Sequence, residues 1–234
     1  MKLKNLLLGD IKFQIKYGFY FLYLIFTIFY IVILSLLPSS WVETVAWLLI
    51  YTDPTTIGLI FMGAIIQLEL AEKTFDSLVI SPITPTKYLL SKTFSLGILS
   101  YLVSVILGLY SKSINNFFTF SLGILLGASI FSCLGMILAF KAKSLNQFIL
   151  FMIPFMIVII FPGIIYLFDY DYLWLLLHPG IAIIHLLAKT NHLWLAFISA
   201  ASWSLFIAIM TLQTIKKNFN HGGKLNREKN HEIV

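Results

Sequence analysis

The feature that most constrains this chain is a series of apolar runs, each long enough to cross a lipid bilayer and separated by short polar breaks. About 20 apolar residues in a helix span roughly 30 Å of hydrocarbon. Lipid offers no hydrogen-bond partners to the backbone, so each spanning segment must be a helix or a strand of a closed barrel. The runs lack the apolar and polar alternation of barrel strands. Six spans are predicted, at about 17–37, 54–71, 90–110, 118–140, 146–168 and 193–214.

The composition supports an all-α integral membrane protein. Only 11% of the 234 residues are charged and 59% are hydrophobic, whereas about 25% of the residues of an ordinary soluble domain are charged. Too few polar side chains exist to coat a soluble globule of this size. The only cysteine, Cys133, lies within an apolar run, so an intrachain disulfide is excluded.

The basic residues predict the orientation in the membrane. With an even number of spans both termini lie on one side, and assigning that side as the cytoplasm leaves only Lys112 and Lys189 outside. The 14 basic residues then inside are Lys2, Lys4, Lys12, Lys16, Lys73, Lys87, Lys92, Lys141, Lys143, Lys216, Lys217, Lys224, Arg227 and Lys229. This bias predicts a multi-pass protein of the cell inner or plasma membrane with both termini in the cytoplasm. The net charge of +6 is explained by topology and anionic lipid, so no nucleic-acid partner is expected.

The termini predict two segments outside the transmembrane domain of residues 17–215. Residues 1–16 place apolar side chains on one face at 100° per residue and polar ones on the other, which indicates an amphipathic interfacial helix. A simple membrane anchor and a specific docking role both remain open for it. Residues 216–234 are rich in Asn, Gly and Lys, which predicts a flexible cytoplasmic tail. The apolar face of the first helix is Leu3, Leu7, Leu8, Ile11 and Ile15.

The outer segment 169–189 is too apolar for a solvated loop, and Pro179-Gly180 breaks it into two pieces too short to span. We expect a pair of short re-entrant helices dipping into the outer leaflet. Asp169, Tyr170 and Trp174 are candidates for an outer gate that caps a pathway. Anchoring by an aromatic belt is the alternative.

The sequence lacks the motifs of several enzyme classes. No P-loop, no His-Glu-x-x-His and no Gly-x-Ser-x-Gly is present. His178 and His185 are seven residues apart, but a chance polar pairing is favoured over a metal site, which usually takes three or four ligands. The deep interiors of the spans lack ionisable residues, which argues against ion-coupled transport. Any transport must then be driven by another polypeptide, and no metal site is predicted.

The richest polar island, residues 69–88, resembles the inner segment of type-2 ABC exporter permeases. In that family the second span ends in acidic residues, followed by a basic residue, a Thr-Leu-Glu-like step, a Ser/Thr-Pro pair and a Tyr-x-x-x-Lys that opens the third span. Leu177-His-Pro-Gly-Ile also resembles the Asn-Pro segment before the last span. The sequence departs from the pattern at Lys73, where the family usually has glycine. The matching residues are Glu69, Glu72, Lys73, Thr74, Asp76, Ser77, Leu78, Ser81, Pro82, Tyr88 and Lys92.

The resemblance implies how the protein is powered. In such exporters a permease pairs with a second permease copy, here expected as a homodimer, and with two copies of a separate ABC ATPase. The segment from about Thr74 to Ile80, stopped by Pro82 and Pro85, is then a coupling helix that sits in a cleft on the ATPase. No cofactor is bound by this chain, because ATP and Mg lie on the ATPase, and the chain itself is not an enzyme.

The resemblance also implies export of a hydrophobic or amphipathic substrate, such as a drug, an antibiotic, a peptide or lipid-linked material. Two other functions remain open: a non-transporting scaffold or sensor subunit, and an intramembrane enzyme, for which the span interiors offer no paired polar groups. The substrate and the identity of the second permease half are left undetermined. From position in the second and fifth spans, the expected pathway residues are Phe61, Met62, Ile65, Phe155, Met156 and Ile159.

Overall fold

The computed structural model describes residues 3–52, 57–167, 172–189 and 191–231, with the backbone alone for 57 and 221–231. Every regular element within these ranges is helical, which confirms the predicted all-α class for the described part of the chain. The elements are α1 (Leu3–Lys16), α2 (Phe19–Leu36), α3 (Ser39–Ile50), α4 (Ile57–Ala71), α5 (Thr74–Ile80), α6 (Pro85–Tyr110), α7 (Phe117–Lys141), α8 (Leu145–Tyr166), η2 (Leu173–Leu177), α9 (Pro179–Ala188) and α10 (Leu193–His231).

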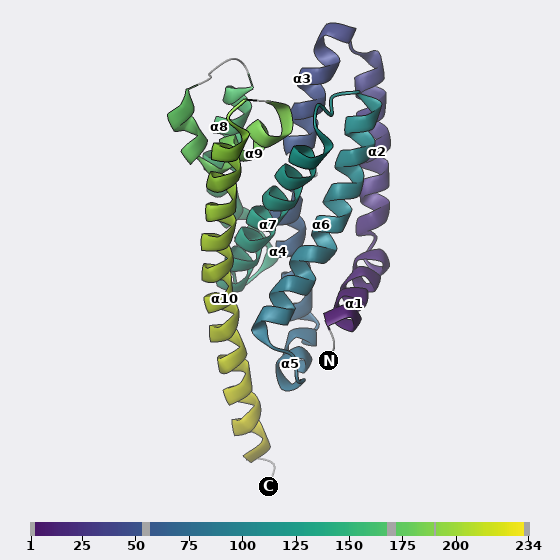
Figure 1. Cartoon of the computed structure of the whole chain (residues 1–234). Coiled ribbons are helices and arrows are strands. Elements are labelled where there is room, and N and C mark those ends of the chain that lie inside the picture. The colour runs from purple at the N-terminus through teal and green to yellow at the C-terminus, as the bar shows by residue number, and fades with distance from the viewer. Residues whose placement is uncertain (1–2, 53–56, 168–171, 190, 232–234) are drawn as a thin grey trace.

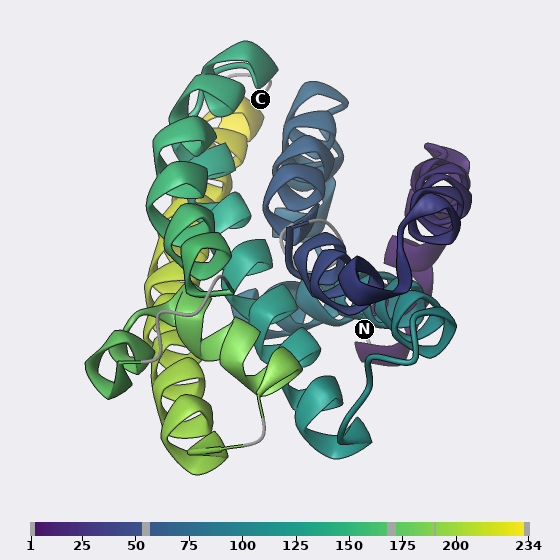
Figure 2. The same cartoon turned by 90° about the horizontal axis from the view of Figure 1, so that it is seen from above.

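The long helices run side by side as an elongated bundle (Figure 1). One end carries α1, α5 and both chain termini, and we call it the α5 end. The opposite end carries α3 and α9 and is called the α9 end (Figure 1). Seen from above, α2 lies on one side of the bundle and α8 with α10 on the other (Figure 2).

Five helices are long and apolar enough to cross a membrane: α2, α6, α7, α8 and α10 up to Asn220. They indicate a multi-pass membrane protein. The predicted span 54–71 corresponds to α4, which has only 15 residues and is short for a crossing. It is preceded by α3, a 12-residue helix that the sequence analysis did not predict. Residues 53–56 between them lie outside the described ranges.

Side-chain caps explain where the long helices begin. The Thr84 hydroxyl accepts a hydrogen bond from the Lys87 backbone N–H at 3.4 Å, and Pro85 occupies the first turn, a position where its missing N–H costs nothing. Helix α6, which corresponds to the predicted third span, therefore starts five residues before the predicted residue 90. Asn116 and Ser144 cap α7 and α8 in the same manner.

Helix α7 forms the centre of the bundle, in contact with α4, α6, α8, α9 and α10. Small residues allow the closest of these approaches. A Cβ atom added to Gly135 would lie 2.3 Å from the backbone oxygen of Leu59 in α4. The contact between α4 and α7 therefore depends on the absence of a side chain at this position.

The outer segment forms two short pieces, η2 and α9, separated at His178 as the Pro179-Gly180 break predicts. Residues 179–187 of α9 are buried, in contact with α7, α8 and α10. This short helix is thus covered by protein, as a re-entrant segment would need to be, and its depth in a membrane stays a prediction.

The last helix does not end at the predicted domain boundary of residue 215. Helix α10 continues to His231, so part of the segment 216–234 is helical. The flexibility of that segment stays a prediction.

Replacing Gly135 with alanine is expected to lower the free energy of unfolding by about 1 to 3 kcal/mol, because the new methyl group overpacks the backbone of α4. Denaturation in mixed micelles measures the change. Gly97→Ala in α6 is the matched control, because its Cβ would meet no described atom within 4 Å. Equal stability of the two variants would contradict the close packing of α4 on α7.

Candidate functional site

Helix α5 has the bounds expected from the sequence, Thr74–Ile80. It is held to the bundle by Phe75, its one buried residue, which is 4% exposed. The Phe75 ring lies 5.9 Å from Tyr88 of α6, 5.2 Å from Phe140 of α7 and 5.4 Å from Phe219 of α10, measured between ring centroids. Such aromatic contacts have a preferred geometry and resist sliding. One side chain thus joins α5 to three long helices.

One face of α5 points away from the bundle, while Leu78 and Val79 pack partly against the core. Asp76 and Ser77 are exposed, and Ile80 is 71% exposed. Leu78 is half-buried. The Ser81 hydroxyl donates to the Leu78 carbonyl oxygen at 2.7 Å, which helps to end the helix. The predicted coupling residues that belong to α5 therefore form a short projection with an accessible face.

The turn between α4 and α5 places Lys73 in the left-handed region, with φ of 55°. This region favours glycine and costs other residues roughly 1 to 2 kcal/mol. It is the position at which the resembling family usually has glycine, so the backbone keeps the turn although the side chain differs. The Thr74 hydroxyl donates to the Glu69 carbonyl oxygen at 3.2 Å and steadies the turn.

Behind α5 lies a buried ion cluster, which we define as Asp10, Glu69 and Lys92 with their partners Tyr88 and Ser91. The Lys92 ammonium contacts Asp10 Oδ1 at 2.7 Å and Glu69 Oε1. Ser91 donates to Asp10 Oδ2, and the Tyr88 hydroxyl donates to Glu69 Oε2 at 2.6 Å. Every carboxylate oxygen therefore has a partner. Full pairing is the condition under which charges this deeply buried are tolerated.

The ion cluster also explains how α1 binds the bundle. Its buried residues are Leu6, Asp10 and Gln14, which lie one turn apart on one face. Gln14 Nε2 donates to the Ser95 hydroxyl of α6 at 2.7 Å. Of the predicted apolar face, Leu8 and Ile15 are exposed and the other three residues are half-buried. Helix α1 thus packs on α6 through Leu6, Asp10 and Gln14, and part of its predicted apolar face is accessible.

The second acidic residue of the predicted site, Glu72, is exposed and bonds elsewhere. The Tyr17 hydroxyl, at the end of α1, donates to Glu72 Oε1. This hydrogen bond raises the pKa of the Tyr17 phenol above its usual value. Glu72 therefore contacts the residue that follows α1 directly, whereas Glu69 is linked to α1 through Lys92.

The structure separates the expected pathway residues into two groups. In α4, Phe61, Met62 and Ile65 are buried within the chain, and Phe61 packs against Phe19 and Tyr23 of α2. In α8, by contrast, Phe155 and Ile159 line a cavity. The sixth residue, Met156, is half-buried against the core.

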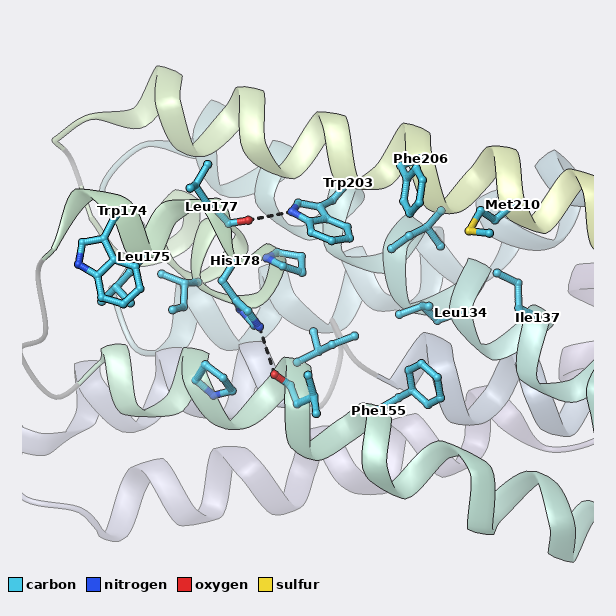
Figure 3. Close-up of a pocket in the computed structure, with 16 residues that line it drawn as sticks. Leu134, Ile137, Phe155, Trp174, Leu175, Leu177, His178, Trp203, Phe206 and Met210 are labelled. Atoms are coloured by element: carbon cyan, nitrogen blue, oxygen red, sulfur yellow. Dashed lines mark hydrogen bonds between the residues drawn. The ribbon is translucent and has the colours of Figure 1, made fainter.

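This cavity has a volume of about 640 Å³ and lies between α7, α8, α10 and the η2 and α9 segment. Figure 3 shows Trp203, Phe206 and Met210 in a row along α10, opposite Phe155 of α8. Trp174, a predicted gate residue, lines its α9 end and is 69% exposed. The other two gate candidates, Asp169 and Tyr170, lie outside the described residues.

A histidine near the cavity contacts a backbone carbonyl oxygen of α8 that lacks its usual hydrogen bond within the helix. Pro162 has no N–H, so the Val158 carbonyl oxygen loses its helical partner. The His178 ring Nε2 lies 3.1 Å from that oxygen (Figure 3) and donates to it when it carries the proton. Burial lowers the pKa of His178 below its usual value, which favours the neutral ring. His185 instead contacts the Tyr166 hydroxyl at 2.8 Å and the Asn191 carbonyl oxygen at 2.6 Å, so the two histidines have different partners.

Comparison with known proteins leaves the family open. No protein-family model matches the sequence, and no curated protein matches it either. The resemblance carried by residues 69–92 therefore stays a hypothesis about this chain.

Sequence reasoning missed Asp10 as a site residue, and it used Lys92 as a topology signal and as part of the resemblance without predicting its buried partners. Asp10 is 7% exposed and Lys92 is 1% exposed, so neither meets water or lipid headgroups freely. A signal was present in each case. Asp10 is an acid within a basic amphipathic segment, and Lys92 lies seven residues into α6, with apolar residues following it.

Replacing Lys92 with methionine is expected to lower the free energy of unfolding by about 3 to 5 kcal/mol, because two buried carboxylates lose their cation. Lys12→Met, on the exposed face of α1, is the control and should have little effect. Replacing Asp10 with asparagine and Glu69 with glutamine in the Lys92→Met background should recover most of the loss. A Lys92→Met variant as stable as the control would show that the ion cluster does not form.

Replacing Lys73 with glycine is expected to raise the free energy of unfolding by up to about 1 kcal/mol, since glycine adopts the left-handed turn without a steric cost. Lys73→Val should lower it, because a β-branched residue is strained at positive φ. Thr86→Gly, in the first turn of α6, controls for the general effect of glycine and should destabilise. The opposite order of the two Lys73 variants would contradict the turn.

Proposed function

We propose that this chain is the membrane-spanning permease subunit of an ATP-driven ABC exporter. In this proposal the chain crosses the membrane six times, with α3 and α4 together making the second crossing. The α5 end lies in the cytoplasm with both termini, in agreement with the bias of basic residues toward that side. The protein then resides in the cell inner or plasma membrane.

The observation that carries the proposal is the form of α5. It is a short helix at the α5 end (Figure 1), with Phe75 anchored among three long helices and with Asp76, Ser77 and Ile80 presented outward. A projection that only capped a loop would need no such anchor. A rigid projection with an accessible face suits a part that receives mechanical work from a partner, and we assign it as the coupling helix.

The ion cluster supports transmission of that work. Glu69 closes α4 just before α5, and Tyr88 and Lys92 open α6 just after it. Because these residues are joined by buried contacts, a displacement of α5 moves the ends of α4 and α6 together. Through Asp10 the same displacement reaches α1. Packed elements of this kind shift as rigid units rather than deforming continuously.

The partners and the substrate class complete the proposal. ATP and Mg are bound by two separate ATPase subunits, and the permease works as a homodimer. The resemblance and the lack of charged residues in the deep interiors of the predicted spans favour a hydrophobic or amphipathic substrate, of the drug, antibiotic or peptide-like kind. Trp174 is retained as part of the proposed outer gate.

A direct test targets the exposed face of α5 without touching its anchor. Asp76→Arg reverses a charge on that face, and Asn146→Arg, at the exposed start of α8, adds a charge at the same end of the molecule. Each variant is co-expressed with a P-loop ATPase encoded beside this chain. We expect the wild type and Asn146→Arg to co-purify with the ATPase. The amount of ATPase that co-purifies with Asp76→Arg should be at least about tenfold lower.

Two results would contradict parts of this proposal. Unchanged co-purification and ATP turnover with Asp76→Arg would refute the coupling role. Transport by the reconstituted complex in vesicles, with and without ATP, separates an exporter from a scaffold or sensor. Binding of the ATPase without ATP-dependent movement of any amphipathic probe would favour the scaffold.

A further inference from the structure

The apolar cavity between α8 and α10 does not end at Met210. A second hollow of about 370 Å³ shares Leu134, Ile137, Phe155 and Met210 with it and runs on toward the α5 end. Its remaining lining residues are Leu138, Lys141, Gln213, Thr214 and Lys217. The two hollows thus form one continuous lateral groove, apolar at the α9 end and basic at the α5 end.

The apolar part of this groove matches an alkyl chain better than a polar ligand. Its walls are aliphatic and aromatic side chains of α7, α8 and α10 (Figure 3). Two tryptophans line it, Trp174 and Trp203, and the Trp203 indole N–H already donates to the Leu177 carbonyl oxygen at 2.8 Å. Apolar surface of this kind gains by covering another apolar surface.

The length of the groove also suits a chain. Lys217 follows Trp203 by 14 positions on α10, a distance of about 21 Å at 1.5 Å per residue. This exceeds half of a hydrocarbon core of roughly 30 Å. A molecule with its head at Lys217 therefore has room along α10 for a full acyl chain from one leaflet.

The basic end supplies the charge for a headgroup. Lys141, in the last turn of α7, and Lys217 of α10 are both exposed and line the same hollow. Neither lysine forms an ion pair with any residue whose side chain is described. Among those residues, both ion pairs are formed by Lys92, outside the groove. Two lysines that line the same end of an apolar groove are complementary in charge to an anionic amphiphile.

We propose that the lateral groove binds one anionic phospholipid of the leaflet on the α5 side, with an acyl chain between α8 and α10 and its phosphate at Lys141 and Lys217. The site requires neither an ATPase nor transport, so its failure and the failure of the exporter proposal are separate results. It assigns to two of the basic residues a defined ligand in place of general contact with the membrane surface.

The test measures binding of phosphatidylglycerol and phosphatidylcholine with identical chains to the full-length protein in detergent, by native mass spectrometry. We expect tighter binding of phosphatidylglycerol. Lys141→Gln with Lys217→Gln should weaken it by about 5-fold per lysine, or roughly 25-fold together. Lys143→Gln with Lys216→Gln is the matched control, because it removes the same charge from exposed neighbours that do not line the groove, and it should leave affinity within about 2-fold.

A second variant tests the chain-binding part. Leu134 lines both hollows, so Leu134→Trp should fill the groove and abolish binding of the lipid while all lysines remain. Equal loss from the two lysine pairs, or equal affinity for the two lipids, would overturn the headgroup site. Unchanged binding in Leu134→Trp would overturn the placement of the chain.

The competing occupant is a second copy of this chain. Met210 is 46% exposed in the groove, and a Met210→Cys variant reports on it through oxidative cross-linking in vesicles. We expect monomer after oxidation, because lipid fills the groove. A covalent dimer formed through this position would overturn the lipid site and assign the groove to the interface between copies.

Discussion

The contact between Lys92 and its two carboxylates is the interaction on which the α5 end depends. A buried ammonium joins Asp10 of α1 to Glu69 of α4 from its own position in α6. Removing Lys92 would leave two buried carboxylates without a cation, and a buried charge that has lost its partner is strongly destabilising. The cluster therefore gives three helices a single arrangement. The position of α5 depends on that arrangement, because short turns connect it to α4 on one side and to α6 on the other.

At the α9 end, too, buried polar groups need partners, but the groups involved there are neutral. Proline in α8 leaves a carbonyl oxygen unpaired, and a backbone acceptor at membrane depth must find a donor. His178 reaches it from the loop before α9, and the Tyr51 hydroxyl donates to the neighbouring Ile159 carbonyl oxygen at 3.0 Å. The loop before α9 is therefore attached to α8 at the carbonyl oxygen that the proline leaves unpaired. Gly180 allows this approach, since an added Cβ would lie 2.2 Å from the same Ile159 oxygen.

The sequence predicted those features that depend on local composition. Long apolar runs predicted the helices α2, α6, α7, α8 and α10, and the Pro82 and Pro85 stops predicted the extent of α5. Helix α3 was missed, because its 12 residues are too few to cross a membrane and it begins with two serines directly after Pro38. The burial of Phe61, Met62 and Ile65 was also unpredictable, since a helix that is apolar all round does not show which face meets protein and which meets lipid.

The ion cluster lay beyond sequence reasoning for a different reason. In the sequence, Asp10 lies 82 positions from Lys92 and Glu69 lies 23 positions from it. Only the packing of α1 against α6 brings Asp10 and Lys92 together. A lysine near the start of a span has the same sequence signature whether it faces headgroups or a buried carboxylate. Counting Lys92 as a topology signal was therefore reasonable, but the count contained no information about its partner.

The separation of Asp10 from Lys92 has a consequence for how the protein is made. During synthesis at about 5 to 20 residues per second, roughly 4 to 16 s pass between the appearance of Asp10 and that of Lys92. Throughout this interval the first helix has no cation to accept its carboxylate, so it must wait at the membrane surface in contact with water. Its docking marks the point at which α4 and α6 have been inserted correctly, and a nascent chain with a misplaced third span would be left with an undocked N-terminus for quality-control proteases to recognise.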